Sequence, residues 1–307
     1  MLLKQPITTL FKKQNRQWQP IANSILCRYY QQQQSHYYSN MSDSCAASTA
    51  NPLYPERPIG YIDLVREKVP YDAGLQIQTY LVNRRHAINK QKQQEQKEYK
   101  GEDPEDIIVF LQHPPTYTAG RRIRGRTELE EEQRLRRLGA DYYETMRGGQ
   151  ITYHGPGQLI AYPILDVRDY QINVRCYVSR LEKTIIDCCK EFGIKANTTD
   201  NTGVWVGQDA KIAALGVHLQ RYVSSHGVAL NCNVDLKWYQ HIVPCGLADK
   251  RVTSLTDQVK KEITPQQTLP VLAHSFQKLF GVPVLPVQPN GTLMREVNSI
   301  LMAASSS

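Results

Sequence analysis

The first forty residues contain no aspartate and no glutamate. They do contain five basic residues, which are Lys4, Lys12, Lys13, Arg16 and Arg28. A basic, acid-free opening with Ser, Thr and Gln is typical of a mitochondrial presequence, and it lacks the long apolar centre of a secretory signal. We therefore expect a mitochondrial matrix location, with a tail that has no targeting role as the alternative. Removing these charges lowers the net charge from +8 to +3, which argues against nucleic-acid binding.

Long apolar runs and common cofactor motifs are also missing. No run approaches the roughly 20 apolar residues of a membrane-spanning helix. The seven cysteines are odd in number and include no C-x-x-C pair, which argues against a disulfide framework and a zinc site. The phosphate-binding pattern G-x-x-x-x-G-K-S/T is absent as well. We therefore expect no membrane span, no metal and no cofactor.

Composition divides the chain into three parts. Residues 1–57 include a glutamine run and a Ser/Ala-rich stretch, so they are predicted to be a presequence and a disordered linker. Residues 58–285 carry the regular apolar patterns and are predicted to form the folded domain. Residues 286–307 are weakly patterned, and we predict a weakly ordered C-terminal tail.

Within the folded domain, strand-like apolar runs outnumber amphipathic helical stretches. Helices are predicted after Pro70 and over residues 127–138, 173–192 and 264–280. The first of these three ranges opens with a capping-box spacing. The polar insertion near residues 88–105 has no core face and is expected to be a solvated helix extension or a loop. Because strands often follow one another directly, we predict an α+β fold in which a mixed sheet is packed with helices.

Two predicted strands and a turn follow one another between Lys211 and Cys245. Lys211 opens the apolar run KIAALGVHL, and residues 227–234 alternate like a second strand. Cys245 lies between proline and glycine, a context that continues neither helix nor sheet. If the strands pair, the ammonium and the thiol could meet, and the cation would favour a nucleophilic thiolate. A surface lysine and a small buried cysteine are the alternatives.

The stretch from Arg147 to Gln158 contains four glycines and a proline. A tight hairpin is the ordinary interpretation, but Arg147, Thr152 and His154 add polar groups of the kind that line a narrow ligand cavity. Arg147 could instead brace the loop by bonding carbonyls. His154 could contact a ligand, bond within the protein or shuttle a proton. Glycine N–H groups at such a loop could also bind an oxyanion.

Four separated blocks, RGGQITYHGPGQL, KIAALGV, HGVALNCNVDL and PCG, together resemble the octanoyltransferases of lipoate biosynthesis, also called lipoyl(octanoyl) transferases. The stretches QHPPTYTAGR and TGVWV support a resemblance that covers about residues 59–281. It implies the fold of the biotin/lipoate protein ligase catalytic domain, with residues 58–285 as an octanoyltransferase catalytic domain.

The resemblance further implies an activity and partners. The acyltransferase would move an octanoyl group from octanoyl-acyl carrier protein to a specific lysine of lipoyl-accepting domains, the first step of endogenous protein lipoylation. The acceptors would be the lipoyl domains of 2-oxoacid dehydrogenase complexes and the glycine cleavage H protein. No cofactor, nucleic acid or membrane is implied.

The resemblance also assigns site residues. It places the nucleophile on Cys245, as a thioester intermediate, and the activating lysine on Lys211. The implied substrate-binding residues are Arg147, Gly148, Gly149, Gln150, Ile151, Thr152, Tyr153, His154, Ala214, Leu215, Gly216, Gly227, Val228 and Ala229. His218 departs from the pattern, because many bacterial members carry arginine or lysine there.

Three other interpretations were weighed. His226 is expected to be a hydrogen-bonding turn residue near the pocket. An ATP-dependent lipoate ligase would share the fold, but it activates a free acid as an adenylate and needs no cysteine. A non-catalytic carrier-binding protein would be expected to have lost Cys245 or Lys211, and neither is lost.

Overall fold

The structure is a computed structural model that describes residues 52–95, 98–242 and 250–305. Most of the predicted presequence and linker, residues 1–51, therefore lies outside the described residues. None of the helices in the described ranges combines the length and the apolarity needed to cross a membrane.

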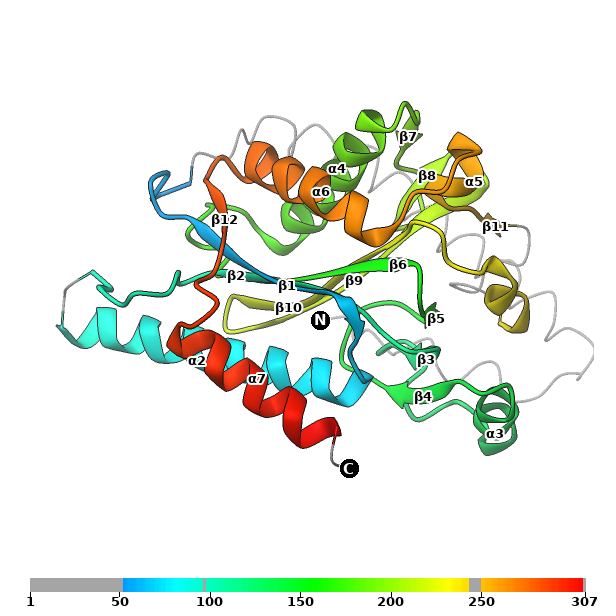
Figure 1. Ribbon diagram of the computed structural model, residues 1–307, viewed down its shortest axis with the longest axis horizontal. Helices are drawn as coiled ribbons and strands as arrows, with labels where there is room; N and C mark the ends of the chain where they lie inside the picture. The colour runs from blue at the N-terminus through cyan, green and yellow to red at the C-terminus, as the bar shows by residue number, and fades with distance from the viewer. Residues whose placement is uncertain (1–51, 96–97, 243–249, 306–307) are drawn as a thin grey trace, which may run out of the picture. The chain divides into compact units, whose positions relative to one another are not determined.

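Within the described residues, nine strands form the main sheet (Figure 1). Their order is β12-β1-β2-β6-β10-β9-β8-β7, and β11 also pairs with β9. The strands are β1 (Ile59–Lys68), β2 (Ile107–Gln112), β6 (Gln158–Ile164), β7 (Ala196–Asn197), β8 (Val204–Val206), β9 (Ala210–Gln220), β10 (Val223–Asn231), β11 (Arg251–Val252) and β12 (Val284–Pro286). Strand β1 pairs in parallel with β2 and β12, and β11 with β9, whereas the other neighbours are antiparallel. The predicted mixed sheet is confirmed.

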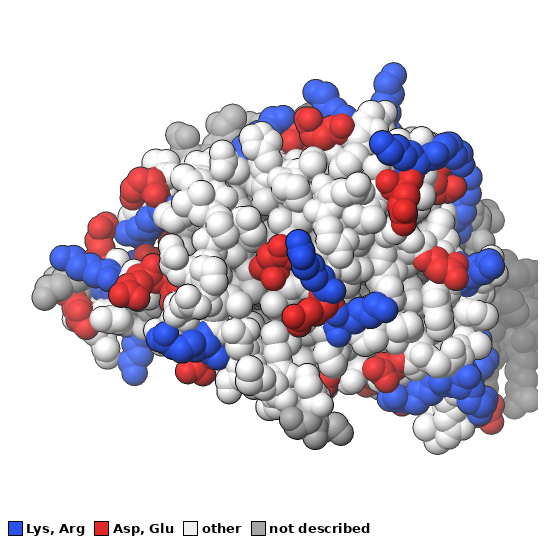
Figure 2. Space-filling view, viewed as in Figure 1, with Lys and Arg blue, Asp and Glu red and all other residues white. Residues whose placement is uncertain are grey.

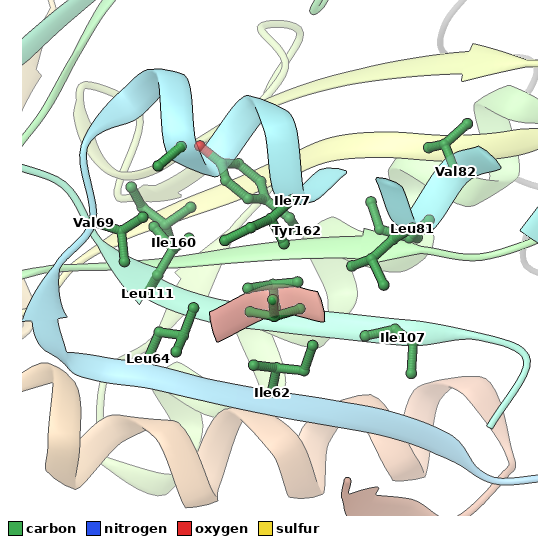
Figure 3. Close-up of a cluster of buried hydrophobic side chains, with 14 of the residues drawn as sticks. Ile62, Leu64, Val69, Ile77, Leu81, Val82, Ile107, Leu111, Ile160 and Tyr162 are labelled. Atoms are coloured by element: carbon green, nitrogen blue, oxygen red, sulfur yellow. The ribbon is translucent and has the colours of Figure 1, made fainter. Parts of the chain in front are cut away.

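Helices cover both faces of this sheet (Figure 1). Helices α2 (Tyr71–Glu95) and α7 (Thr292–Ser305) lie on one face, and α4 (Val174–Glu191) and α6 (Pro265–Phe280) lie on the other. Strands β2 and β6 are buried along their whole length because both of their faces are covered, which explains their nearly continuous apolar sequence. Side chains from β1, β2, β6 and α2 meet in the core cluster between the sheet and α2 (Figure 3).

A second, smaller sheet has the strand order β4-β3-β5 within the described residues. It consists of β3 (Thr116–Ala119), β4 (Asp141–Glu144) and β5 (Ile151–His154), with helix α3 (Leu129–Arg137) and the 3-10 helix η2 (Leu236–His241) beside it. Tyr153 of β5 stacks on Trp238 with ring centroids 5.2 Å apart, so aromatic packing holds η2 against this sheet. Because β5 leads directly into β6, the predicted glycine-rich stretch joins the two sheets.

The remaining helix predictions have different outcomes. The side chain of Asn173 caps α4, and Thr264 forms a capping box at the start of α6, as the sequence patterns indicated. The capping box at Thr127 is wrong, because α3 is preceded by Glu128 with no side-chain cap, and the Thr127 hydroxyl instead accepts a 2.7 Å hydrogen bond from the Tyr142 hydroxyl.

The two weakly patterned segments are both partly helical. Helix α2 continues into the polar insertion as far as Glu95. The weakly ordered tail predicted after residue 286 is wrong, since α7 forms there and buries Leu293 and Val297 in the core cluster beside α2. The apolar residues of α7 are spaced as in a helix, but the segment is short, so the periodic pattern extends over few turns. The element α5 (Leu255–Val259) completes the described helices.

Candidate active site

A cavity of about 470 Å³, including its open mouth, lies where the glycine-rich stretch meets β6, β9 and β10. This size is within the roughly 300–1,000 Å³ of small-molecule sites. All but two of the predicted substrate-binding residues line it, and Gly148 and Tyr153 do not. The lining residues are Tyr71, Arg147, Gly149, Gln150, Ile151, Thr152, His154, Ile160, Tyr162, Ala214, Leu215, Gly216, His226, Gly227, Val228 and Ala229. Strands far apart in the sequence therefore bring the three predicted segments together.

The two exceptions have structural reasons. Tyr153 points into the aromatic cluster of the smaller sheet, where it is fully buried, because side chains alternate between the faces of a strand. Gly148 donates its backbone N–H to the Val217 carbonyl at 3.0 Å, which ties the glycine-rich stretch to β9. A Cβ at Gly216 would approach the Gly148 carbonyl oxygen to 2.8 Å, so this close approach requires glycine.

The cavity has a buried inner end and a partly exposed mouth. Tyr71, Ile160 and Tyr162 are at most 4% exposed and form the inner end. The residues of partial exposure belong to the two segments 149–151 and 214–216. A ligand would therefore enter between the glycine-rich stretch and β9, and its far end would lie against buried apolar and aromatic groups.

Arg147 is buried and braces the glycine-rich stretch. Its guanidinium donates to the Gly148 carbonyl at 2.9 Å and to the Gln150 carbonyl at 2.8 Å. It also donates to the backbone carbonyl and the hydroxyl of Thr118 at 2.6 and 2.7 Å. The bracing role that the sequence left open is present, and Arg147 also lines the cavity.

The histidines at the inner end are held neutral. His113 lies between the Val69 carbonyl, 2.6 Å from Nδ1, and the Tyr162 hydroxyl, 2.8 Å from Nε2. Burial lowers its pKa to about 4, so Nδ1–H donates to the carbonyl and Nε2 accepts from the tyrosine. Burial, followed by the neighbouring His113 and Arg147, lowers the pKa of His154 well below its usual value.

His154 has its tautomer set by a glutamine. Its Nδ1 lies 2.9 Å from Gln158 Oε1, while Gln158 Nε2 donates to Asn231 Oδ1 at 2.9 Å. The neutral imidazole therefore donates from Nδ1 and keeps Nε2 as an acceptor. Asn231 is part of this buried network.

His226 differs from its expected place in a turn. It lies inside β10, and its backbone N–H donates to Gln78 Oε1 at 2.6 Å. Its φ of 55° is in the left-handed region that non-glycine residues rarely adopt. Burial, then the Arg147 charge, lowers the pKa of its ring to about 3. His226 was predicted to lie near the pocket, and it lines the cavity.

Lys211 is buried near one end of β9 but does not line the cavity. Its ammonium donates to the Thr202 carbonyl at 3.2 Å and lies 4.6 Å from the ring centroid of Trp205. It is three residues from Ala214, so the two Cα atoms are about 10 Å apart along the strand. The sequence prediction that Lys211 opens a buried strand is confirmed, and its catalytic role stays a prediction.

A partly buried carboxyl accompanies Lys211. Glu182 of α4 accepts the backbone N–H of Gly203 at 3.0 Å. Gly203 adjoins Thr202, and a Cβ there would approach the Lys211 Cε to 3.1 Å. Burial raises the pKa of Glu182 to about 7, although the hydrogen bond and the Lys211 charge oppose the rise. Nothing in the sequence alone had singled out Glu182.

Cys245 lies outside the described residues. The chain resumes at Lys250, and β11 pairs Arg251 with Ala210 and Val252 with Lys211. The Thr253 N–H also donates to the Lys211 carbonyl at 2.9 Å. The polypeptide that follows Cys245 therefore returns beside Lys211.

Comparisons with known proteins agree with this geometry. Residues 73–277 match the model of the lipoyl protein ligase A/B catalytic domain. The chain is 48% identical over 176 residues to the mitochondrial octanoyl-acyl-carrier-protein:protein N-octanoyltransferase of Danio rerio, covering 57% of this chain and 78% of that protein. It is 44% identical over 186 residues to the mitochondrial octanoyltransferase of Arabidopsis thaliana, covering 58% of this chain and 79% of that protein.

The chain belongs to the octanoyltransferase family. It is an acyltransferase, as the resemblance implied. Among solved structures, lipoate-protein ligase A bound with ATP covers 79% of this chain and 94% of its own, with a TM-score of 0.54 and 14% identity. The bipartite lipoate protein ligase of Thermoplasma acidophilum gives the same TM-score and identity, over 80% and 93%. These structures confirm the predicted ligase catalytic-domain fold.

Three residues that line the cavity were not among the residues predicted from the sequence. Tyr71, Ile160 and Tyr162 line the cavity from the start of α2 and from β6. Ile160 and Tyr162 are two positions apart, so they share one face of β6, and that alternation was visible in the sequence. Tyr71 carries no comparable signal, because its position depends on how α2 packs on the sheet.

Proposed function

We propose that this protein transfers an octanoyl group from octanoyl-acyl carrier protein to a specific lysine of lipoyl-accepting domains. The observation that carries the proposal is the cavity, whose inner end is formed by Ile160 and the uncharged side chains of Tyr71 and Tyr162, in a member of the octanoyltransferase family. The acceptors are the lipoyl domains of 2-oxoacid dehydrogenase complexes and the glycine cleavage H protein. The reaction is the first step of endogenous protein lipoylation.

The cavity suits an eight-carbon chain. Ile160, Leu215, Val228 and Ala229 provide apolar lining, and no charged carboxylate lines the cavity in the described part of the chain. Burying the seven CH₂ and CH₃ groups of an octanoyl chain at ~0.8 kcal/mol each supplies roughly 5 kcal/mol before entropy costs. The octanoyl chain enters through the mouth of the cavity, and its thioester group stays at the mouth.

The first half-reaction forms an acyl-enzyme. Lys211 holds Cys245 as a thiolate, which attacks the octanoyl thioester on the phosphopantetheine arm. A tetrahedral oxyanion forms and collapses, and the departing carrier thiolate takes a proton from the Lys211 ammonium and leaves as the thiol. Octanoyl-Cys245 and a neutral Lys211 remain. Cys245 lies six positions before Arg251, the first residue of β11, so it can be at most about 22 Å from that strand, and this span allows the thiol to reach Lys211.

Backbone N–H groups of the glycine-rich stretch are the source of oxyanion stabilisation in this proposal. The Gly148 N–H already donates to Val217, and the Gly157 N–H donates to Gln112 Oε1 at 2.7 Å. Of the two remaining glycines, Gly149 lines the cavity and Gly155 does not, so Gly149 is the preferred donor from this stretch.

The second half-reaction passes the octanoyl group to the acceptor lysine. The acceptor amine attacks the thioester carbonyl, and neutral Lys211 takes its proton. His154 is a poor alternative base, because burial lowers its pKa well below its usual value and a weakly basic imidazole holds a proton poorly. The amide is more stable than the thioester, so the transfer needs no ATP.

An ATP-dependent lipoate ligase is the alternative function, because ligases share this fold. Two observations favour the transferase. The named octanoyltransferases are 44–48% identical to this chain, whereas those ligases are 14% identical. The chain also has the cysteine that a ligase does not require.

The proposal includes a mitochondrial matrix location reached through a presequence within residues 1–57. The acid-free N-terminus supports it, and the octanoyltransferases from Danio rerio and Arabidopsis thaliana are named mitochondrial. Residues 1–42 fused to a fluorescent protein are expected to carry it into mitochondria. A diffuse cytosolic signal would contradict the location and leave the chemistry untouched.

Intact-mass measurement tests the acyl-enzyme directly. Incubation with octanoyl-acyl carrier protein is expected to add one octanoyl group, labile to hydroxylamine, and Cys245→Ala is expected to abolish it. Cys232 is the matched control, since burial raises its pKa to about 12 and keeps it protonated, so Cys232→Ala should still be acylated. A Cys245→Ala protein that transfers octanoate at the original rate would refute the mechanism.

A further inference from the structure

Four arginines lie within six residues of the loop between β3 and α3. They are Arg121, Arg122, Arg124 and Arg126, and we call residues 121–126 the arginine loop. All four side chains are exposed. None of them pairs with a carboxylate in the part of the chain that the structure describes. Lys and Arg side chains also gather at the end of the molecule where β4 and α3 lie (Figure 2).

The arginine loop is fixed to the mouth of the cavity by its backbone. The Arg121 N–H donates to the Arg147 carbonyl at 3.0 Å. The Arg122 N–H donates to the Gly149 carbonyl at 3.2 Å. Because Arg147 and Gly149 line the cavity, these arginines are held beside its entrance, even though the loop is exposed.

The β9 side of the cavity mouth is also affected by the positive charge of the arginine loop. Burial, and then the charge of Arg121, lowers the pKa of His218 on β9. His218 is two residues beyond Gly216, which belongs to the partly exposed lining. Positive charge therefore reaches both sides of the entrance, while the inner end of the cavity stays neutral.

We propose that the arginine loop is the docking surface for the acidic protein that delivers the octanoyl thioester. The inference rests on the proposed function and adds the surface by which the donor is recognised. Complementary charge accelerates encounter and orients the partner, and unpaired exposed arginines keep their full charge for that purpose. Once docked there, a donor has its acyl arm next to the cavity mouth.

Charge also decides between the donor and the acceptor. The phosphopantetheine arm of the donor carries a phosphate, which arginine binds through paired N–H groups. The acceptor instead presents a lysine ammonium, which four neighbouring arginines repel. The acceptor is therefore expected to approach from a direction other than the arginine loop.

Two donors separate docking from chemistry. Octanoyl-acyl carrier protein presents the acidic protein and the phosphate, whereas octanoyl-pantetheine presents only a small neutral thioester. For the Arg122→Gln/Arg126→Gln double variant of the full chain, we expect KM for the carrier-borne donor to rise on the order of tenfold, with KM for octanoyl-pantetheine unchanged. In the parent protein, added salt should raise only the first KM, since screening acts over about 8 Å at physiological ionic strength.

Matched variants test whether the effect belongs to this loop. Lys183→Gln/Lys190→Gln removes the same number of positive charges from exposed positions on α4, on the sheet face opposite α2, and should leave both KM values unchanged. Arg122→Lys/Arg126→Lys keeps the charge and should restore most of the affinity for the carrier.

Several outcomes would overturn the docking proposal. Equal changes of KM for the two donors would mean that the loop acts on the cavity, and no change for either would mean that the loop does not dock the donor. Loss of binding to a single-stranded oligonucleotide or to anionic vesicles, with the carrier KM unaltered, would assign the loop to another partner. A parent protein that accepts octanoate from neither donor would instead reject the proposed function.

Discussion

Near the inner end of the cavity the buried imidazoles of His113 and His154 are uncharged, whereas near the end of β9 a buried ammonium lies close to a partly buried carboxyl. Burial lowers the pKa of both histidines, and neutral donors and acceptors satisfy them. The Lys211 ammonium has a carbonyl and an aromatic face, and Glu182 titrates nearby with a pKa of about 7. The same sheet therefore carries a neutral cavity end in one place and a pair of ionisable groups in another.

Replacing Lys211 is expected to have the largest effect on this division. Lys211→Met should reduce octanoyl transfer by at least about a hundredfold for two reasons. The Cys245 thiol would return toward a pKa of about 8.5, with only a few per cent thiolate at pH 7, and the proposed base for the acceptor amine would be lost. Iodoacetamide alkylation of Cys245 should slow, with its pH profile moved upward.

The Lys211→Arg variant separates charge from proton transfer. The guanidinium keeps the positive charge, so octanoyl-enzyme should still form, but it cannot lose a proton, so transfer to the lipoyl domain should be slow. Transfer by Lys211→Arg at the parental rate would show that Lys211 is only a fixed cation, and the base would have to be sought elsewhere.

Glu182→Gln is expected to change the pH dependence of stability. The folded pKa of about 7 lies above the ordinary value of 4.5, so the folded state binds more protons and the free energy of unfolding falls as pH rises from 4.5 through 7. The shift corresponds to about 3 kcal/mol above pH 7. Glutamine can still accept the Gly203 N–H and carries no charge. The variant should therefore match the parent near pH 4.5 and exceed it at pH 8 in urea unfolding.

The matched control for Glu182 lies on the same helix. Glu191 is exposed at the end of α4, so Glu191→Gln should leave the stability profile parallel to that of the parent. If Glu182→Gln also gives a parallel profile, the Glu182 carboxyl is not the titrating group. The region around Lys211 would then not differ from the histidine region in this way.

Tyr162→Phe tests the neutral region and has the smallest expected effect. It removes the hydroxyl that donates to His113 Nε2 and leaves a buried acceptor without a partner, which should cost about 1–3 kcal/mol of stability. Thermal unfolding measures the loss. Tyr61→Phe is the control, because the Tyr61 hydroxyl has no hydrogen-bond partner in the described ranges. Equal melting temperatures for Tyr162→Phe and the parent would show that the network does not hold His113.

The sequence predicted most of the cavity because its residues are consecutive within strands and turns. The segments around Arg147, Ala214 and Gly227 carry glycines and apolar alternation, and both signals depend only on local geometry. Tyr71 and Glu182 were missed for the opposite reason. Each comes from a helix whose register against the sheet decides what its side chain contacts, and no local pattern encodes that register.

The same limit explains the two wrong element predictions. Thr127 has the spacing of a cap, but Tyr142 takes its hydroxyl in a tertiary contact. The apolar residues of α7 are helically spaced, but their burial depends on how the helix packs in the cluster that includes Ile77 and Leu81 of α2. Predicted domain boundaries, Cys245 and the residue roles stay predictions.

The pairing of β1 with β12 has a consequence for how the chain is made. Ile59 pairs with Val284, so the first described strand receives one of its two neighbours from nearly the end of the chain. During synthesis that edge stays open until more than two hundred further residues have been added. An open edge is a template for pairing with another chain. Nascent chains that stall before β12 and α7 are therefore expected to aggregate.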